Sequence, residues 1–243
     1  MTTLLPSSPE APSPPGERGR HPAAAGSRRR GVLRLSQSRW ARIGLPALAV
    51  VCAVAAALAL SFPALSNWYA ARAQRALAAQ IDDPTVAGQP AAAAGGEGHA
   101  LGRIVIAAIG LDMVMVQGIG AGDLAEGPGH YPATAMPCTA GDAAVAGHRT
   151  TFLHPFYDLN ELVPGDLIKV TTPPASCTYV VSGIPFAVAP GDTAVVAPTP
   201  GQWILTLTTC TPRGSARQRL VVKAVMVPSS LRPAPSSVAG NAA

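Results

Sequence analysis

Residues 203–210 read Trp-Ile-Leu-Thr-Leu-Thr-Thr-Cys, an apolar run of β-type composition that ends in a cysteine. Short runs rich in Val and Ile recur between residues 101 and 227, and most are separated by Gly, Pro or Asp. None is long enough for a typical helix, and many short strands at this spacing predict an all-β barrel or sandwich. The predicted strands are 103–109, 111–117, 143–146, 167–171, 178–182, 203–208 and 220–227, and residues 155–162 predict a brief helical turn.

Cys210 stands at the end of its predicted strand, and a loop (residues 211–215) follows it at once. A thiol in this position can be exposed without breaking the strand pairing, and nearby Arg side chains favour its thiolate. His148 likewise follows a short apolar strand, so it could be the base that a thiol nucleophile requires. From the residues alone, this is a Cys/His pair with Arg219 as a candidate cation, and such pairs also arise by chance.

The motifs around these three residues resemble those of the sortase family. Residues 206–210 (Thr-Leu-Thr-Thr-Cys), with Arg219 nine residues after the cysteine, are similar to the TLxTC…R signature of sortases. His148 lies within Ala-Gly-His-Arg-Thr-Thr, which is similar to the histidine motif of the family. Further similar segments are 109–112, 127–132, 155–159 and 164–166, so that the resemblance covers about residues 101–227.

The resemblance implies an all-β fold: a closed eight-stranded sortase-type β-barrel with short helical turns. Cys210 would attack the Thr–Gly carbonyl of a C-terminal LAXTG- or LPXTG-type sorting signal and form a thioacyl enzyme. His148 would be the acid and base, and Arg219 would hold the substrate backbone and stabilise the oxyanion. An amine of a peptidoglycan precursor would be the acceptor. This chemistry needs no cofactor and no metal, and the sequence contains no cluster of His and Cys ligands.

Residues 210–220 are most similar to class E sortases of actinobacteria, which favour LAXTG over LPXTG signals. The Ala-, Arg- and Pro-rich composition is compatible with such a source. Gly214 stands where class E often has Phe, so classes F and C remain open. Ala108 and Gln117 also differ from the Pro and Glu that are common in the family.

The net charge of +5 belongs to the N-terminal tail. Residues 1–42 contain eight Arg and two Glu, which gives +6, and the remainder of the chain carries −1. A nucleic-acid surface would need basic residues clustered on the folded domain. We therefore expect no nucleic-acid partner.

Residues 43–65 are almost wholly apolar, and about 20 such residues suffice for a helix to cross a membrane. Trp40 precedes this run and Trp68 and Tyr69 follow it, where aromatic rings prefer the headgroup level. Six Arg lie between residues 28 and 42, so the positive-inside rule predicts one span with the N-terminus in the cytoplasm. A cleaved signal peptide is the alternative, but its apolar core is usually only about 7–15 residues long.

Composition divides the chain into five predicted segments. These are a disordered basic cytoplasmic tail (1–42), a transmembrane anchor (43–69), a helical stalk with a flexible linker (70–100), the catalytic domain (101–227) and a disordered Pro/Ser/Ala tail (228–243).

The other histidines are weaker candidates for the base. His99 lies in the predicted linker and His154 in a predicted surface loop. His130 lies in a Gly- and Pro-rich loop, which is more typical of a structural or groove-lining residue.

Arg219 is preferred to Arg213 and Arg217 because it opens a strand, whereas the other two lie in a loop. We expect Arg149 at the surface. Thr209 could help to position the thiol or the substrate, although a purely structural threonine in a buried strand fits equally well.

The remaining cysteines are Cys52, Cys138 and Cys177. Cys52 lies in the predicted span and is expected to act as a small apolar residue. If Cys210 is the nucleophile, Cys138 and Cys177 are left as an even pair in an exported domain, where a disulfide could form. Geometry has to decide this, because the two Cα atoms must lie within about 7 Å.

Two other classes of protein compete with a sortase. Peptidases of the papain or NlpC type place Cys before His, which is opposite to the order of His148 and Cys210 in this sequence. L,D-transpeptidases carry a Ser-His-Gly-Cys type motif that the sequence lacks. A membrane-anchored binding module without activity is disfavoured because Cys210, His148 and Arg219 are all present. The expected partners are surface proteins with a C-terminal sorting motif, a peptidoglycan precursor amine and the membrane, and we expect a monomer.

Overall fold

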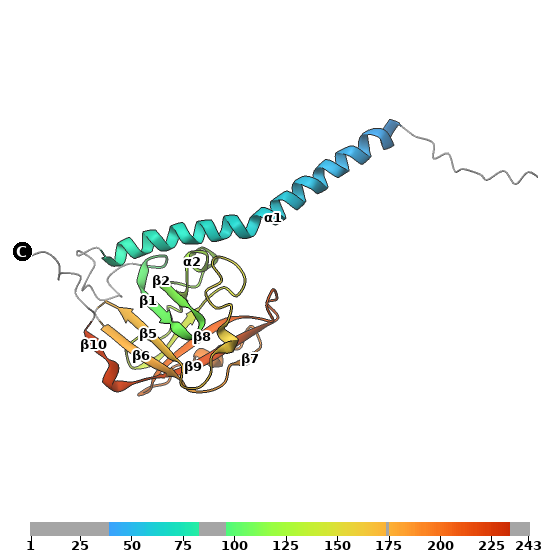
Figure 1. Ribbon diagram of the computed structural model, residues 1–243. Helices are drawn as coiled ribbons and strands as arrows, with labels where there is room; N and C mark the ends of the chain where they lie inside the picture. The colour runs from blue at the N-terminus through green and yellow to red at the C-terminus, as the bar shows by residue number, and fades with distance from the viewer. Residues whose placement is uncertain (1–38, 83–95, 174, 234–243) are drawn as a thin grey trace, which may run out of the picture. The chain divides into compact units, whose positions relative to one another are not determined.

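A closed ring of eight strands forms the body of the protein (Figure 1). The computed structural model describes residues 39–82, 96–173 and 175–233. The ring order is β6–β5–β1–β2–β3–β4–β8–β9, and pairing of β6 with β9 closes it. The eight strands are β1 (Ala100–Ile106), β2 (Leu111–Gln117), β3 (Gly129–His130), β4 (Gly141–Ala146), β5 (Leu167–Thr172), β6 (Ala175–Val181), β8 (Trp203–Thr211) and β9 (Gln218–Met226). The predicted eight-stranded barrel is therefore confirmed.

Two short strands and five helical segments complete the described structure. The strand β7 (Phe186–Val188) pairs with β9, and β10 (Arg232–Pro233) pairs with β6. The helical segments after the N-terminal helix α1 (Arg39–Asp82) are η1 (Ala107–Ile109), α2 (Ala121–Glu126), η2 (Leu159–Glu161), η3 (Thr193–Val196) and η4 (Pro228–Ser230). The predicted helical turn at residues 155–162 contains η2.

Several sequence-based boundaries differ from the structure, among them the end of the first strand and the end of the domain. The predicted strand 103–109 ends at Ile106, because residues 107–109 form η1 and Gly110 follows in the left-handed region at φ 64°. A tail from residue 228 is also wrong, since η4 and β10 continue the domain to Pro233. A two-residue strand such as β10 has no side-chain alternation from which it could be predicted.

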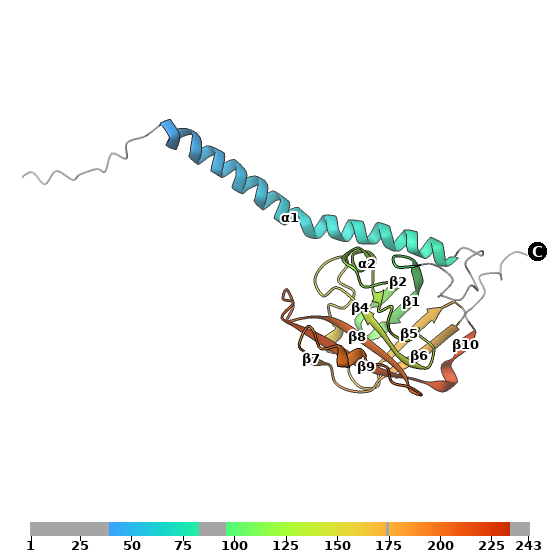
Figure 2. The same cartoon turned by 180° about the vertical axis from the view of Figure 1, so that it is seen from behind.

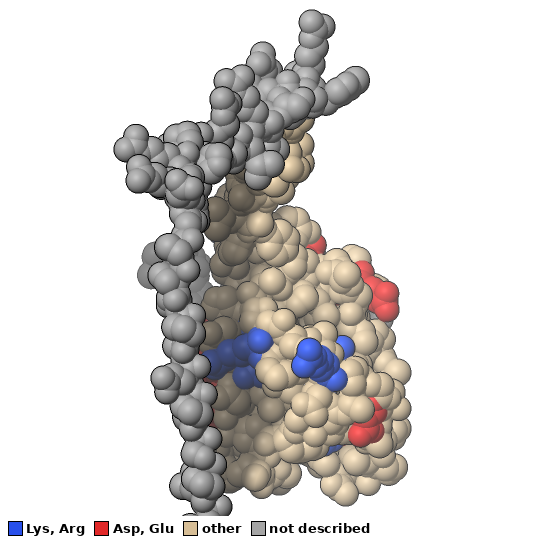
Figure 3. Space-filling view, turned by 90° about the vertical axis from the view of Figure 1, so that its right-hand side faces the viewer, with Lys and Arg blue, Asp and Glu red and all other residues tan. Residues whose placement is uncertain are grey.

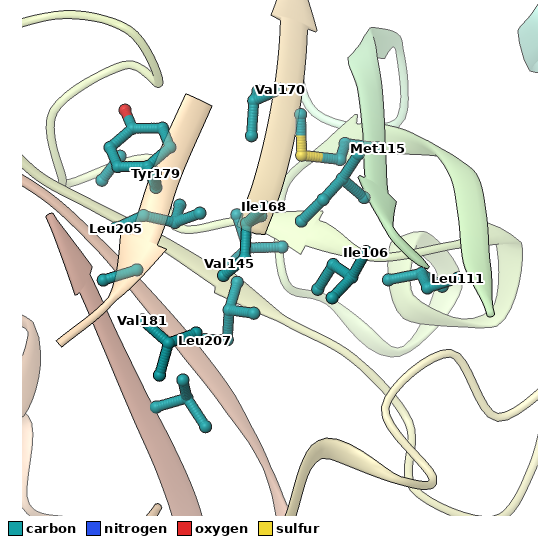
Figure 4. Packing of buried hydrophobic residues seen from close by; sticks show 14 of the residues in the cluster. Ile106, Leu111, Met115, Val145, Ile168, Val170, Tyr179, Val181, Leu205 and Leu207 are labelled. Carbon is teal, nitrogen blue, oxygen red and sulfur yellow. The ribbon is translucent and has the colours of Figure 1, made fainter. Parts of the chain in front are cut away.

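The alternation of side chains along the strands separates the barrel interior from its outer face. Leu205 and Leu207 of β8 are fully buried in the core cluster. Thr206 and Thr208, which alternate with them along the strand, lie on its opposite face and are also buried. Figure 4 shows the interior packing, with branched aliphatic side chains from opposite strands in contact around Ile168 and Val145. Each such side chain stabilises the fold by about 1.5–3 kcal/mol through its removal from water.

The helix α1 runs without interruption from Arg39 to Asp82. It includes a stretch, Gly44–Ile81, that is long and apolar enough to cross a membrane, and a window of 18 residues within it has a mean hydropathy of 2.4. The predicted anchor and the predicted helical stalk thus form one helix. The predicted cytoplasmic tail up to residue 38, linker residues 83–95 and the tail from residue 234 lie outside the described residues.

The part of α1 beyond Val50 belongs to the same compact unit as the barrel, residues 51–243. Leu77 is buried against Val114 and Val116 of β2. The amide of Gln74 donates to the carbonyl oxygens of Val114 and Glu126, and its oxygen accepts from Val114 N. The predicted stalk is therefore docked on the barrel.

Cys138 and Cys177 form a disulfide with an S–S distance of 2.07 Å and a Cα–Cα distance of 5.7 Å. The bridge joins the loop between β3 and β4 to β6. Cys138 N also donates to the hydroxyl oxygen of Tyr179. Together these contacts fix the loop over one end of the barrel core.

A buried ion pair joins β4 to β9 on the outer face. Asp142 Oδ2 lies 2.6 Å from Lys223 Nζ, and the Asp142 side chain is fully buried. Asp142 Oδ1 accepts a hydrogen bond from the hydroxyl of Thr206, 2.6 Å away. Lys223 Nζ also donates to the carbonyl oxygen of Val195 in η3, so the pair ties the loop after β7 to the barrel.

Asp142→Ala should lower the free energy of unfolding of the full chain in detergent micelles by about 2–4 kcal/mol. The substitution leaves the Lys223 ammonium without its carboxylate in a mostly buried position, and such losses are large. Urea unfolding followed by circular dichroism measures the effect. Asp112→Ala is the matched control: its pair with Arg103 is exposed, so it should cost less than about 1 kcal/mol. Equal losses in the two variants would contradict the assignment.

Candidate active site

The pairing of three neighbouring strands places Cys210, His148 and Arg219 at one edge of the sheet. Cys210 of β8 lies directly opposite Arg219 of β9 in the antiparallel pair. The strand β4 runs parallel to β8, with Ala146 opposite Thr208. His148 follows Ala146 by two residues, and Cys210 follows Thr208 by two residues. Because parallel strands run in the same direction, His148 therefore lies level with Cys210. Figure 2 shows β4, β8 and β9 as neighbours on this side of the barrel.

The backbone between β4 and His148 continues the pairing beyond the strand itself. Gly147 N donates to Thr208 O, and Gly147 O accepts from the buried hydroxyl of Thr209 at 2.7 Å. A Cβ atom on Gly147 would lie 2.6 Å from the Phe156 ring, so only glycine allows this close approach. Thr209 thus holds the strand that carries His148 and has its hydroxyl turned away from the surface.

Cys210 forms no disulfide, and the residue is partly exposed at the strand end. The His148 ring is partly buried and packs against Phe152, with 5.1 Å between the ring centroids. Burial lowers the pKa of the His148 imidazole. At neutral pH the ring is therefore mainly neutral, which is the form that can accept a proton from a thiol.

Arg219 is partly exposed, and its Nη1 donates to the carbonyl oxygens of Ala216 and Gln218. None of the ion pairs between described residues involves Arg219. Its guanidinium thus remains open to an anionic or carbonyl group of a ligand. The neighbouring Arg217 is exposed in the loop before β9.

The outer face of β8 below Cys210 carries a second polar contact. The Tyr131 hydroxyl lies 2.9 Å from Thr208 Oγ1, two residues before the cysteine.

A cavity of about 310 Å³ lies at the start of β4, between residues 133–142 and 196–200. A second cavity of about 210 Å³ lies between residues 109–113 and 153–158. Neither is lined by Cys210, His148 or Arg219. On the face in Figure 3 the charged side chains form small, separate groups.

His130 is fully buried, and its ring is held by three polar groups. Nδ1 lies 2.9 Å from Gln117 Oε1, and Nε2 lies 2.8 Å from Ala135 O and 3.2 Å from Thr134 Oγ1. These contacts join β2 and β3 to the following loop, as expected of a structural residue. His99 and His154 are exposed.

Lowering the pH from about 7.5 to 5 should destabilise the chain, in part through His130. Burial lowers the pKa of His130 below its usual 6.5. At pH values between the lowered pKa of the folded state and the usual pKa of the unfolded state, the unfolded state binds more protons. The stability that His130 contributes is therefore full above pH 6.5 and falls as the pH falls. His130→Asn should flatten this pH dependence, as measured by urea unfolding across the range. An unchanged slope in the variant would contradict a buried, neutral His130.

Arg149 is the site residue that the sequence placed wrongly. It was expected at the surface, but it is only 5% exposed. Its Nε donates to Tyr157 O, its Nη1 to the carbonyl oxygen of Cys210 at 3.2 Å, and its Nη2 to Asn160 Oδ1 at 2.6 Å. Burial lowers the pKa of this guanidinium, which nevertheless stays protonated at neutral pH. A buried cation therefore supports the backbone of the cysteine itself.

Arg213 supports the same region from the surface. Its guanidinium stacks on the Tyr157 ring at 4.1 Å and pairs with Asp158 at 2.8 Å. The only signal in the sequence that Arg149 belongs to the site is its position next to His148. The fold turns it inward because the segment 157–161 and the end of β8 present carbonyl and amide acceptors to it.

Arg149→Met should lower the free energy of unfolding by about 2–4 kcal/mol, because it removes the three hydrogen bonds that the buried guanidinium donates. Arg213→Met removes a pair that is more than a third exposed on each side and should cost less than about 1 kcal/mol. Chemical unfolding of the two full-length variants compares them directly. A larger loss for Arg213→Met would show that the buried guanidinium is not the main support.

The structure is a closed barrel in which a free thiol, an imidazole and a guanidinium lie at the ends of three adjacent strands. It is therefore a barrel protein with a thiol-based candidate active site. The family model of the Sortase domain matches residues 104–227. The chain belongs to the sortase family.

The similar proteins include sortases of the E and D types. Sortase SrtE1 of Streptomyces coelicolor is 38% identical over 111 residues, which are 41% of this chain and 32% of that protein, so the chain spans about a third of this curated relative. Sortase E1 of the same species, solved with a tripeptide in its active site, is 29% identical with a TM-score of 0.52, over 60% of this chain and all of that one. A sortase D5 transpeptidase of Clostridium perfringens is 32% identical with a TM-score of 0.50, over 54% and 81% of the two chains. The likeness to sortase E proteins fits the class E-like motif of residues 210–220.

Proposed function

We propose that the chain is a membrane-anchored cysteine transpeptidase. It cleaves a C-terminal sorting signal of the LAXTG or LPXTG type between Thr and Gly and transfers the acyl group to an amine of a cell-wall precursor. The observation that carries the proposal is the strand register that brings the free thiol of Cys210 beside Arg219 and level with His148. The tripeptide in the active site of Streptomyces coelicolor sortase E1 and the transpeptidase from Clostridium perfringens support a peptide substrate.

In the first half-reaction, neutral His148 takes the proton of the Cys210 thiol. The sulfur then attacks the threonyl carbonyl carbon, and the carbonyl oxygen becomes an oxyanion that the Arg219 guanidinium stabilises. Collapse of this intermediate breaks the C–N bond to glycine, and the His148 imidazolium gives its proton to the departing amine. The products are a thioester on Cys210 and a peptide that begins with glycine.

In the second half-reaction, the acceptor amine attacks the thioester carbonyl. His148 takes a proton from the incoming amine and returns it to the sulfur as the C–S bond breaks. The new amide joins the threonine to the acceptor, and the free thiol is restored. Exposure of Cys210 at the strand end leaves room for the peptide substrate and then for the acceptor amine.

We further propose that α1 anchors the enzyme in a bacterial membrane as a single pass, with the N-terminus inside and the barrel outside. The apolar window within Gly44–Ile81, which is long enough to cross a membrane, supports the anchor. The six Arg between residues 28 and 42 support the orientation by the positive-inside rule. In this arrangement, residues 1–42 are the cytoplasmic tail, and a catalytic domain extended to Pro233 acts on surface proteins.

The full chain in detergent micelles should cleave an LAXTG peptide and join a glycine or diaminopimelate-type amine to its threonine. Cys210→Ala should abolish both steps, and His148→Ala and Arg219→Ala should each lower kcat/KM by about 10²–10³-fold. Mass spectrometry of the peptide products measures cleavage and transfer separately.

Arg217→Ala is the matched control, since this arginine is exposed two residues before Arg219, and it should behave like the parent. Cleavage by Cys210→Ala at the parental rate would overturn the mechanism. If the parent cleaves the peptide but forms no amine product at a saturating concentration of acceptor, the protein is a thiol peptidase and not a transpeptidase.

A further inference from the structure

The loop that follows His148 has an unusual backbone. Phe152, Leu153 and His154 all have positive φ values, at 51°, 61° and 39°. This left-handed region is disfavoured for residues with a Cβ atom, and three in succession are rare. The conformation therefore needs partners that hold it.

Part of that support comes from α1. Leu153 N donates a hydrogen bond to Asn67 Oδ1 of the helix, 2.8 Å away. The Phe62 ring meets the Phe152 ring edge to face, with 6.3 Å between centroids and an interplanar angle of 83°. Other bonds of this segment are local, among them those from His154 N to Thr151 O, from Phe156 N to His148 O and from Tyr157 N to His154 O.

The same face of α1 continues against the barrel. Phe62, Ser66, Ala70 and Gln74 are spaced by four residues, so they follow one side of the helix. Ser66 and Ala70 are buried, and their small side chains allow close approach. Gln74 hydrogen-bonds β2. The contact with the loop is thus the end of a continuous docked face.

Phe152 links this face to the candidate active site. Its ring stacks on the His148 ring at 5.1 Å with a tilt of 30°. An aromatic ring in this position covers one face of the imidazole and restricts its rotation, which a residue that shuttles protons between fixed atoms requires.

We infer that α1 is a positioning element of the active site: Phe62 and Asn67 hold the 152–154 loop so that Phe152 keeps the His148 ring in place. The helix then has two roles, as anchor and as part of the scaffold of the base. The catalytic consequence rests on the proposed function, whereas the covering of the ring does not.

Modification of His148 by diethyl pyrocarbonate tests the covering without any need for activity. In the full chain in detergent micelles, Phe62→Ala and Asn67→Leu should each raise the rate of His148 modification at least about threefold. Peptide mass spectrometry measures this rate relative to the exposed His99, which lies outside the loop. Leu65→Ala on the same helix and Asn67→Asp, which keeps an acceptor oxygen, should match the parent. Equal rates in Phe62→Ala and the parent would overturn the inference.

Peptide cleavage by the same variants tests the catalytic consequence. Phe62→Ala and Asn67→Leu should lower kcat about three- to tenfold with KM within twofold of the parent, and Asn67→Asp should restore most of kcat. A parental kcat in both variants would overturn the positioning role and leave the proposed function standing. An inactive parent would overturn the proposed function, and the modification rates would still decide whether α1 covers His148.

Discussion

The parallel pairing of β4 with β8 is the constraint on which the candidate active site depends. Most strand pairs in the barrel are antiparallel, but these two end at the same edge, with Ala146 opposite Thr208. A shift of either strand by one residue would turn its side chains to the opposite face. Cys210 would then point into the core, and Thr209 would leave its bond to Gly147 O. The close contact between Gly147 and Phe156 helps to exclude such a shift.

Buried polar groups fix the strands that lead to this edge. The Arg149 guanidinium bonds the carbonyl of Cys210, His130 joins β2 and β3 to the loop before β4, and the pair of Asp142 and Lys223 crosses the outer face. Each of these groups is costly to bury without partners. Their satisfied contacts therefore favour one arrangement of the strand ends over neighbouring ones, and the exposed thiol gains a rigid support.

The closed barrel was implied by the resemblance to sortases, whereas the strands themselves were predictable because some of them carry a strong alternation. Leu205 and Leu207 against Thr206 and Thr208 show it within a single run of sequence. The short strands β3, β7 and β10 were not predicted, since two or three residues carry no period and depend on a neighbouring strand to pair with. The end of the domain was misplaced for the same reason. Residues 228–233 have a Pro- and Ser-rich composition, but Ser230 bonds Thr178 of β6.

The sequence by itself determined the barrel class, an apolar segment long enough for a membrane, and Cys210, His148 and Arg219 as the candidate residues. These follow from local periodicity and from motifs that are contiguous in the chain. Only the tertiary structure decided that Cys138 reaches Cys177, that Arg149 turns inward, and that α1 contacts the loop beside His148. The reason is physical: such contacts join residues 39 to 86 positions apart, and their formation depends on how strands and helix pack in space.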